Sequence, residues 1–314
     1  MKIAIVGVGA MGSVYAALLA SAGHEVWGID AWAEHVAAIN AKGLRLTGAS
    51  GERTARIHAT TEPSDAGPCD LVIIATKAAN VLQAAESARL LLKPGATVLT
   101  IQNGLGSAEN VAAALGTDRV AIGVVGGFGA SIRAPGEAHH NGMELVRLGE
   151  LDGPVTPRLE AVAEVWRSGG FTVKTFDDIH QMIWEKLICN VGLSGPCALA
   201  GVTVGQLIGD RDGWAIASGC ASEAWRVAKA KGIKVQIEDP VAYLRAFAEK
   251  LPGARPSMLL DHLAGRASEV DAINGAIPPA AAAVGLEAPL NVAVSSLIRV
   301  KERAMLAQSA ASRA

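Results

Sequence analysis

The sequence lacks the long apolar runs that cross membranes. Half of its 314 residues are hydrophobic, yet no uncharged apolar run reaches the roughly 20 residues that a spanning helix needs. A strand-like segment, residues 2–6, starts at once and is not preceded by the charged and apolar zones of a secretory signal. We therefore expect no membrane partner and a cytoplasmic location.

The sequence also lacks an excess of one charge, and it lacks cysteines spaced as in metal sites. The 28 Lys and Arg residues balance 30 Asp and Glu residues, and there is no basic block with interleaved aromatics of the nucleic-acid-binding kind. The four cysteines form no C-x-x-C pair and have no zinc-type histidine spacing. These absences argue against a nucleic-acid partner and a metal site. We expect the cysteines to be reduced core residues.

The pattern of strand-like runs changes along the chain. Up to about residue 130, β-branched runs alternate with alanine-rich helical stretches, which is typical of successive βαβ units. Shorter strand-like pieces follow between about 128 and 175, including 144–148 and 171–173, and are expected to extend the same sheet. The strands predicted before them cover residues 2–6, 25–29, 71–75, 97–101 and 120–125.

Helical segments dominate beyond about residue 176. Breaks in them are expected at Gly195-Pro196, Gly209, Pro252-Gly253 and Pro278-Pro279. Since 314 residues exceed the usual size of one hydrophobic core, two domains with a cleft between them are favoured. We predict an α/β fold: an N-terminal Rossmann-type dinucleotide-binding domain (1–175) followed by a mostly α-helical substrate and catalytic domain (176–314).

A glycine-rich motif follows the first strand directly and opens an apolar helix that reaches Ala22, with Gly23 placed for a left-handed cap. Gly7 permits a tight turn, Gly9 a close approach of backbone to pyrophosphate, and Gly12 close packing of helix on strand. The helix N-terminus adds amide donors for phosphate. The predicted cofactor-binding loop consists of Gly7, Val8, Gly9, Ala10, Met11 and Gly12.

An acidic residue ends the second predicted strand. Asp30 stands about 20 residues after the glycines, where a carboxylate can accept both ribose hydroxyls of NAD and would repel a 2′-phosphate. No arginine stands at residues 31–34 to receive NADP. We therefore predict NAD as the cofactor, with NADP as the alternative. The competing interpretation is that Asp30 only caps the following helix.

Polar residues follow two further strands. Lys77 comes after residues 71–76, and Asn103 with Gly104 comes after residues 97–101. In open parallel sheets, ligands bind beyond the carboxyl ends of the strands. Each residue alone could be a solvated loop residue. Their parallel positions near the glycine loop nevertheless predict Lys77 and Asn103 as cofactor-binding residues.

Hydride transfer to a carbonyl leaves an alkoxide that needs a proton donor. Histidine is the usual donor, but the seven histidines are scattered. His139-His140 lies in a turn-rich stretch without an acidic neighbour, and we interpret this pair as a surface loop with His140 at the cleft rim.

A better set of polar groups lies on the predicted helix of residues 183–194. Lys186, Asn190 and Ser194 are spaced i, i+4, i+8 and so share one stripe of that helix. Spacing alone leaves two interpretations open. Lys186 is a catalytic cation, or it extends its stem from a partly buried helix while Asn190 satisfies a backbone group.

Several motifs, in order from residue 1 to about 300, together resemble the ketopantoate reductase (2-dehydropantoate 2-reductase) family of pantothenate biosynthesis. They are G-V-G-A-M-G, the A-T-K of Lys77, the Q-N-G of Asn103, W-E-K-L-x-x-N with Lys186 and Asn190, and S-M-L-x-D-x-x-x-G-R-x-S-E-V-D-x-x-N-G from Ser257 to Gly275. The last two motifs are specific to that family among Rossmann enzymes.

The resemblance implies roles for individual residues. Lys186 donates the proton, Glu269 supports the lysine or a water beside it, and Ser257 binds the substrate carboxylate. Without the resemblance, Glu269 would be an ordinary surface carboxylate paired with Arg266 one turn away. The implied substrate-binding residues are Asn103, Asn190, Ser194 and Ser257.

Two departures from the family pattern bear on the substrate. The family's N-P-L-T-A is replaced by S-G-P-C-A from Ser194 to Ala198, and the asparagine expected before Ser257 is absent from Ala254-Arg255-Pro256. Both missing asparagines are of the kind that would bind a distal substrate hydroxyl. The leading prediction is interconversion of a 2-oxo acid and a 2-hydroxy acid, with ketopantoate as the first-named substrate.

Two alternatives remain open. One is an NAD-dependent D-2-hydroxyacid dehydrogenase of the same superfamily acting on a branched or bulky acid, which Asp30, Ser194 and Ala254 favour. The other is a non-catalytic dinucleotide-binding sensor, which would require the loss of Lys186 or Glu269. The expected partner is a small-molecule acid, and a homodimer is the candidate oligomeric state.

Overall fold

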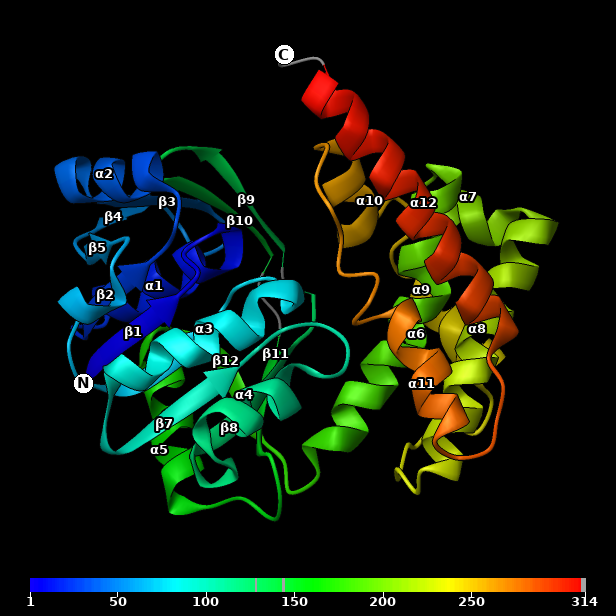
Figure 1. Cartoon of the computed structure of the whole chain (residues 1–314), viewed down its shortest axis with the longest axis horizontal. Coiled ribbons are helices and arrows are strands. Elements are labelled where there is room, and N and C mark those ends of the chain that lie inside the picture. Colours follow the sequence, from blue (N-terminus) through cyan, green and yellow to red (C-terminus); the bar gives the residue numbers. More distant parts are fainter. Residues whose placement is uncertain (128, 143–144, 312–314) are drawn as a thin grey trace. The chain divides into compact units, whose positions relative to one another are not determined.

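The computed structural model describes residues 1–127, 129–142 and 145–311. They form two compact units, which can be followed by colour in Figure 1. Unit 1 comprises Met1–Gln102 and Gly106–Ile179, and unit 2 comprises Asn103–Leu105 and the chain from His180 onward. In the described part of the chain, no helix has both the length and the apolar character needed to cross a membrane.

An eight-stranded sheet forms the centre of unit 1. Its strands are β1 (Lys2–Val6), β2 (Glu25–Ile29), β5 (His58–Thr60), β6 (Cys69–Ile74), β7 (Leu92–Thr100), β8 (Val120–Val125), β11 (Leu145–Glu150) and β12 (Thr172–Thr175). The order is β12-β11-β8-β7-β6-β1-β2-β5. The six neighbouring strands β8, β7, β6, β1, β2 and β5 all run parallel to one another. This is the strand order of dinucleotide-binding domains, so the predicted α/β Rossmann fold is confirmed.

The predicted strands can be compared with the observed ones. Residues 2–6, 25–29 and 120–125 form strands with those bounds. The strands predicted at 71–75 and 97–101 overlap β6 and β7, and each observed strand begins earlier and ends one residue sooner. The pieces predicted at 144–148 and 171–173 join the large sheet as β11 and β12, although Glu144 lies outside the described residues. β11 runs antiparallel to β8.

A second, four-stranded sheet was not expected from the sequence. Its strands are β3 (Leu44–Gly48), β4 (Arg53–Ala55), β9 (Gly129–Ala134) and β10 (Glu137–Gly142), in the order β4-β3-β10-β9. The expectation that the pieces after residue 128 all extend the large sheet is therefore wrong for β9 and β10. The reason is a long-range pairing, since β10 lies parallel to β3, with His139 opposite Thr47. No local pattern reveals such a pairing.

The interpretation of His139-His140 as a surface loop is also wrong. Both residues lie in β10, and His140 is fully buried. His140 Nδ1 lies 3.1 Å from the hydroxyl of Ser50, and His139 Nδ1 lies 2.9 Å from that of Thr47. Strand pairing therefore buries His140 within a polar stretch that the sequence pattern made look exposed.

Among the described residues of unit 1, five α-helices accompany the sheets: α1 (Ala10–Ser21), α2 (Ala33–Lys42), α3 (Val81–Ala88), α4 (Ser107–Leu115) and α5 (Pro157–Ser168). Helix α1 contacts β1 and β2 of the large sheet and all four strands of the small one, so it is buried between the sheets. Its end is followed by Gly23 at φ +89°, as the predicted left-handed cap requires. Helices α3 and α4 pack side by side (Figure 1).

Unit 2 is helical in the described residues. Its helices are α6 (Ile179–Ala200), α7 (Val204–Gly209), α8 (Arg211–Ala230), α9 (Pro240–Ala248), α10 (Ser257–Leu263), α11 (Ile277–Ala282) and α12 (Pro289–Ala311). Apolar side chains of α6, α8 and α12 form its core. The predicted break at Gly209 is confirmed as the end of α7, and Pro252-Gly253 separates α9 from α10, whereas Pro278-Pro279 occupies the first turn of α11.

The predicted break at Gly195-Pro196 is wrong, because α6 continues through both residues to Ala200. The residues from Val191 to Ala198 are all buried. A Cβ atom on Gly195 would come within 2.6 Å of Asn274 Oδ1. Close packing thus holds the helical conformation across a proline that by itself disfavours it.

Candidate functional site

The glycine loop of unit 1 leaves space where a ligand phosphate is expected. Gly7 has φ +94°, and a Cβ atom there would lie 2.8 Å from the backbone nitrogen of Thr76. A Cβ atom on Gly12 would lie 1.9 Å from the carbonyl oxygen of Gly7, so the helix packs closely on the loop. No heavy atom lies within 4 Å of the Cβ position of Gly9, the N-cap of α1. The loop therefore has open space beside the amide groups of a helix N-terminus, as a pyrophosphate requires.

The remaining residues of the loop anchor it to the core. Val8 is fully buried, and Met11 packs partly buried against the core of unit 1. Ala10 begins α1 and is half-buried. The apolar residues of the predicted cofactor loop thus support the glycine backbone rather than extend toward solvent.

Asp30 lies directly after β2 and is half-buried. Its carboxylate accepts a hydrogen bond from the backbone of Trp32 at 3.0 Å, and its own N–H donates to Thr60 at the end of β5. The N-cap of α2 is Trp32, not Asp30. Asp30 therefore closes a local turn at the carboxyl end of the sheet, and the interpretation of it as a helix cap is wrong.

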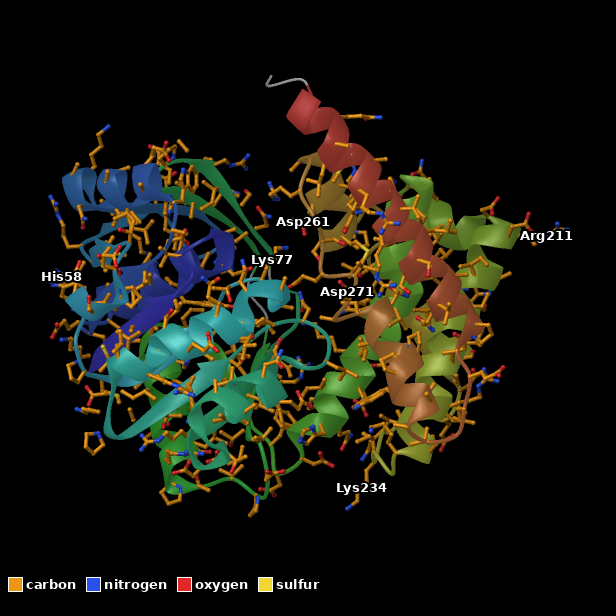
Figure 2. All side chains as sticks on the ribbon, in the orientation of Figure 1. His58, Lys77, Arg211, Lys234, Asp261 and Asp271 are labelled. Atoms are coloured by element: carbon orange, nitrogen blue, oxygen red, sulfur yellow. The ribbon has the colours of Figure 1, made fainter. Side chains whose placement is uncertain are left out.

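Gln102 joins the ends of β6 and β7, a role that the sequence analysis missed. Its amide nitrogen donates to the carbonyl oxygens of Ile74 at 2.7 Å and Thr76 at 3.1 Å, and its amide oxygen accepts from the hydroxyl of Thr100. The hydroxyl of Thr76, next to Gly7, is buried and has no hydrogen-bond partner among the described residues. An unsatisfied polar atom beside the glycine loop fits a site for a polar ligand. Lys77 follows directly and is exposed (Figure 2).

Three residues that lie far apart in the sequence meet within unit 2. The ammonium of Lys186, on α6, donates to Oδ1 of Asn103 at 2.7 Å. Nδ2 of Asn103 donates to Oε2 of Glu269 at 3.3 Å. Arg266 pairs with Asp261 at 3.0 Å, so the alternative pairing of Glu269 with Arg266 is wrong. A cation, an amide and a carboxylate form one hydrogen-bonded set, which we call the Lys-Asn-Glu set.

The backbone of unit 2 brings Asn103 to this set. Gly104 has φ +86°, and a Cβ atom on it would lie only 1.9 Å from the carbonyl oxygen of Ala272. The N–H of Leu105 donates to that same carbonyl at 2.9 Å. Only glycine permits so close an approach. The segment Asn103–Leu105 therefore lies directly on the turn that follows Glu269.

The other predicted substrate-binding residues occupy different environments. Asn190 lies one turn after Lys186 on α6 and is half-buried, whereas Ser194 is only 5 % exposed. Ser257 is exposed and is the first residue of α10. Ala254, at one of the two departures from the family pattern, is half-buried before that helix.

The four cysteines are core residues. All four are free and buried, which confirms the expectation of reduced core residues. Burial raises the pKa of the thiols of Cys189, Cys197 and Cys220 to about 12. They are therefore neutral and unreactive at physiological pH.

Family models account for nearly the whole chain. The model described as ketopantoate reductase PanE/ApbA matches residues 3–153, and its C-terminal counterpart matches residues 178–302. The chain belongs to the ketopantoate reductase family. Ketopantoate reductases are oxidoreductases that use a pyridine nucleotide, and this enzyme class is the one that the sequence motifs predicted.

Individual ketopantoate reductases resemble the chain over nearly its whole length. It is 35 % identical to a 2-dehydropantoate 2-reductase of Pyrococcus abyssi, over 96 % of this chain and 98 % of that protein. A crystal structure of a PanE/ApbA family ketopantoate reductase from Ralstonia eutropha superposes with a TM-score of 0.89 at 31 % identity, covering 97 % of this chain and 99 % of that one.

A D-mandelate dehydrogenase shares the same fold. Its ternary structure with NADH and anilino(oxo)acetate has a TM-score of 0.87 and 28 % identity, and the match covers 97 % of this chain and 99 % of that one. The fold of ketopantoate reductases is thus found in an enzyme whose structure contains NADH together with anilino(oxo)acetate.

Proposed function

We propose that the chain reduces a 2-oxo acid to a 2-hydroxy acid with a nicotinamide dinucleotide, and that ketopantoate is the leading substrate. The observation that carries this proposal is the Lys-Asn-Glu set, in which Nζ of Lys186 lies 2.7 Å from Asn103. A sensor without chemistry would not need a positioned cation joined to a carboxylate. The names of the relatives support the substrate class.

In this proposal unit 1 holds the dinucleotide and unit 2 supplies the proton donor, in line with the predicted division at residues 175 and 176. The open space at Gly9 receives the pyrophosphate, and Asp30 accepts the ribose hydroxyls, which favours NAD over NADP. Lys77, after β6, adds a cation at the same edge of the sheet. When bound, the reduced nicotinamide supplies a hydride to the keto carbon.

Lys186 supplies the proton that the oxygen of the keto group requires. A proton moves from Nζ of Lys186 to the keto oxygen, which becomes a hydroxyl group. The neutral amine of Lys186 then regains a proton from water. Asn103 holds Nζ in place through its amide oxygen, and Glu269 orients that amide. Asn190 and Ser194 contribute polar groups from the same helix, and Ser257 binds the substrate carboxylate.

A panel of acids tests the proposed function. Ketopantoate, 2-oxoisovalerate and a 2-oxo acid with an aromatic side chain are each assayed with NADH and NADPH, together with the matching D-2-hydroxy acids and NAD. Because Ser194 and Ala254 stand where the family has asparagines, the pocket offers fewer partners for a distal hydroxyl. We expect 2-oxoisovalerate to reach a kcat/KM equal to or above that of ketopantoate.

The results of the panel separate the candidates. A preference for ketopantoate by more than about a hundredfold would show that Ser194 and Ala254 do not relax the specificity. Faster oxidation of a bulky D-2-hydroxy acid with NAD would support the dehydrogenase alternative instead. If no acid is turned over, the proposal is wrong. Light scattering and cell fractionation test the homodimer and the cytoplasmic location, which also remain proposals.

A further inference from the structure

Glu302 is a buried carboxylate to which the mechanism above gives no role. It lies on α12 and is 8 % exposed. Its Oε1 atom accepts hydrogen bonds from the backbone N–H of Ser268 at 2.8 Å, from the hydroxyl of Ser268 at 2.6 Å, and from Nε2 of His262 at 3.0 Å. One oxygen atom on α12 thus binds two separate segments of unit 2.

Glu302 is held in its charged form. Burial by itself would raise its pKa, but the hydrogen bonds from Ser268 and His262 outweigh burial and hold the pKa below its ordinary value. A buried charge is seldom the most stable choice for a core position, because apolar side chains of similar size often stabilise as well or better. Such a group is therefore a candidate for a task other than stability.

The first segment that Glu302 binds leads into the Lys-Asn-Glu set. Ser268 directly precedes Glu269, whose carbonyl oxygen accepts from the N–H groups of Ala272 and Ile273, both at 3.1 Å. Glu269 thus begins a tight turn, and its carboxylate contacts Asn103. A double contact with Ser268, through backbone and side chain, fixes the start of that turn.

The second segment is α10. His262 lies five residues after Ser257 on this short helix, so the contact with Glu302 holds the last turn of α10 against α12. The same carboxylate therefore holds the helix that begins with the proposed carboxylate-binding serine and the turn that begins with Glu269. Among the described residues, no other carboxylate accepts hydrogen bonds from both Ser268 and His262.

We propose that Glu302 is a positioning residue for the proton-donor site, which sets the place of Glu269 by binding Ser268 and His262. This inference rests on the proposed function of the Lys-Asn-Glu set. Glu302 touches neither Lys186 nor Asn103 in the structure. Its effect passes through Glu269, and this makes the inference testable by a double-mutant cycle.

The experiment compares Glu302→Ala, Glu302→Gln, Glu269→Gln and the double variant Glu269→Gln/Glu302→Ala. We expect Glu302→Ala to lower kcat at least tenfold while the affinity for NADH, from fluorescence titration, stays within threefold of wild type. Glu302→Gln keeps an acceptor oxygen and should recover most of the loss. In the Glu269→Gln background, Glu302→Ala should change kcat less than twofold, because the residue through which it acts is already altered.

A matched control comes from the other end of α12. Glu223 is 3 % exposed, and its carboxylate accepts from the backbone of Leu290 and Asn291 and from the side chain of Asn291. It anchors the same helix but touches neither Ser268 nor His262. Glu223→Gln should lower Tm and leave kcat within twofold of wild type.

Hydrogen exchange supplies a readout that does not depend on turnover. Glu302→Ala should speed exchange of the Ala272 and Ile273 amides at least tenfold, whereas Glu223→Gln should leave them unchanged. Unaltered exchange at these amides overturns the inference. It is also overturned if kcat stays within twofold in Glu302→Ala, if Glu223→Gln lowers kcat equally, or if the two effects add fully in the double variant. If no 2-oxo acid is turned over, the proposed function fails, and exchange alone decides on Glu302.

Discussion

The amide of Asn103 joins a cation to an anion. Its oxygen accepts from Lys186 at 2.7 Å, and its nitrogen donates to Glu269 at 3.3 Å. An amide has its acceptor and its donors on different atoms, so these two charged partners determine which way it faces. The position of Nζ is thereby defined by side chains on three separate segments. A general acid requires such a defined position.

Replacing Lys186 by alanine should remove the proton donor and leave the dinucleotide site intact. We expect kcat to fall by roughly 10²–10⁴-fold, as for the loss of a general acid, while the affinity for NADH stays close to wild type. Turnover and fluorescence titration measure the two quantities. Lys234→Ala is the control, because Lys234 is exposed in the same unit (Figure 2). Near-normal turnover in Lys186→Ala would eliminate the proposed donor.

Asp30 should set the choice of nucleotide. Its carboxylate would repel the 2′-phosphate of NADP, so the wild-type kcat/KM should be higher for NADH than for NADPH. Asp30→Ala should lower the ratio of kcat/KM for NADH to kcat/KM for NADPH by about tenfold, which corresponds to about 1.4 kcal/mol. Steady-state kinetics with both cofactors measure this. Glu34→Ala removes a nearby exposed carboxylate and should leave the ratio unchanged. A wild-type preference for NADPH would refute the role of Asp30.

At the scale of elements, helix α6 and the segment after β7 show where local rules stop. Proline inside a helix costs about 3 kcal/mol relative to alanine, which is why a break was predicted at Gly195-Pro196. Because the residues on both sides of Pro196 are buried in the core of unit 2, α6 continues through the proline. The segment Asn103–Leu105 groups with unit 2, although its neighbours on both sides in the chain belong to unit 1. Contacts with Ala272 account for this grouping.

Two neighbouring glycines allow the role of this segment to be tested. Both Gly104 and Gly106 have positive φ, but a Cβ atom would meet the carbonyl of Ala272 only at Gly104, since nothing lies within 4 Å at Gly106. Both alanine variants suffer the same backbone strain, of about 1 kcal/mol. We expect Gly104→Ala in addition to displace Asn103 from Glu269 and to lower kcat about tenfold or more. Equal kcat values for the two variants would contradict this.

At the scale of the whole molecule, a buried histidine connects the glycine loop of unit 1 with its small sheet. The N–H of Gly136, in the turn between β9 and β10, donates to Nδ1 of His35 at 3.0 Å. The Nε2 atom of His35 lies 3.4 Å from the hydroxyl of Ser13, which itself donates to the carbonyl of Val8. His35 must be neutral to accept from Gly136. Burial lowers the pKa of His35, and this outweighs the opposing effect of Asp30.

This histidine makes stability depend on pH. Unfolded, His35 takes up a proton near its ordinary pKa of about 6.5, but the folded protein resists protonation until a lower pH. Its contribution is therefore complete above pH 6.5 and is lost as the pH falls toward the lowered pKa. In urea unfolding between pH 8 and 5, His35→Gln should reduce the slope of the unfolding free energy by up to about 1.4 kcal/mol per pH unit.

The exposed His58 serves as the control for this measurement (Figure 2). Comparison with His58→Gln shows whether the loss of an exposed imidazole by itself changes the slope. His140, whose pKa is also lowered by burial, remains in both variants, so some acid sensitivity should persist in His35→Gln. An unchanged slope in His35→Gln would show that its protonation is not linked to unfolding.

The features that the sequence by itself determined are those that neighbouring residues encode. Strand, glycine loop and helix follow one another within residues 2–21, and the spacing of Lys186 and Asn190 places both on one face of α6. Steric and hydrogen-bonding preferences of this kind act over a few residues, so a local pattern suffices to predict them. The motifs therefore indicated the fold class and the candidate site.

The partners of those residues were decided only by the tertiary structure. Asn103 lies 83 positions from Lys186 and 166 positions from Glu269 in the sequence. The pairing of β10 with β3, which buries His140, also joins segments that are remote in the sequence. Which remote segments meet depends on how the whole chain buries its apolar surface, and no short segment of the sequence contains that information. The Lys-Asn-Glu set and the contacts of Glu302 with Ser268 and His262 therefore become visible only in the folded chain.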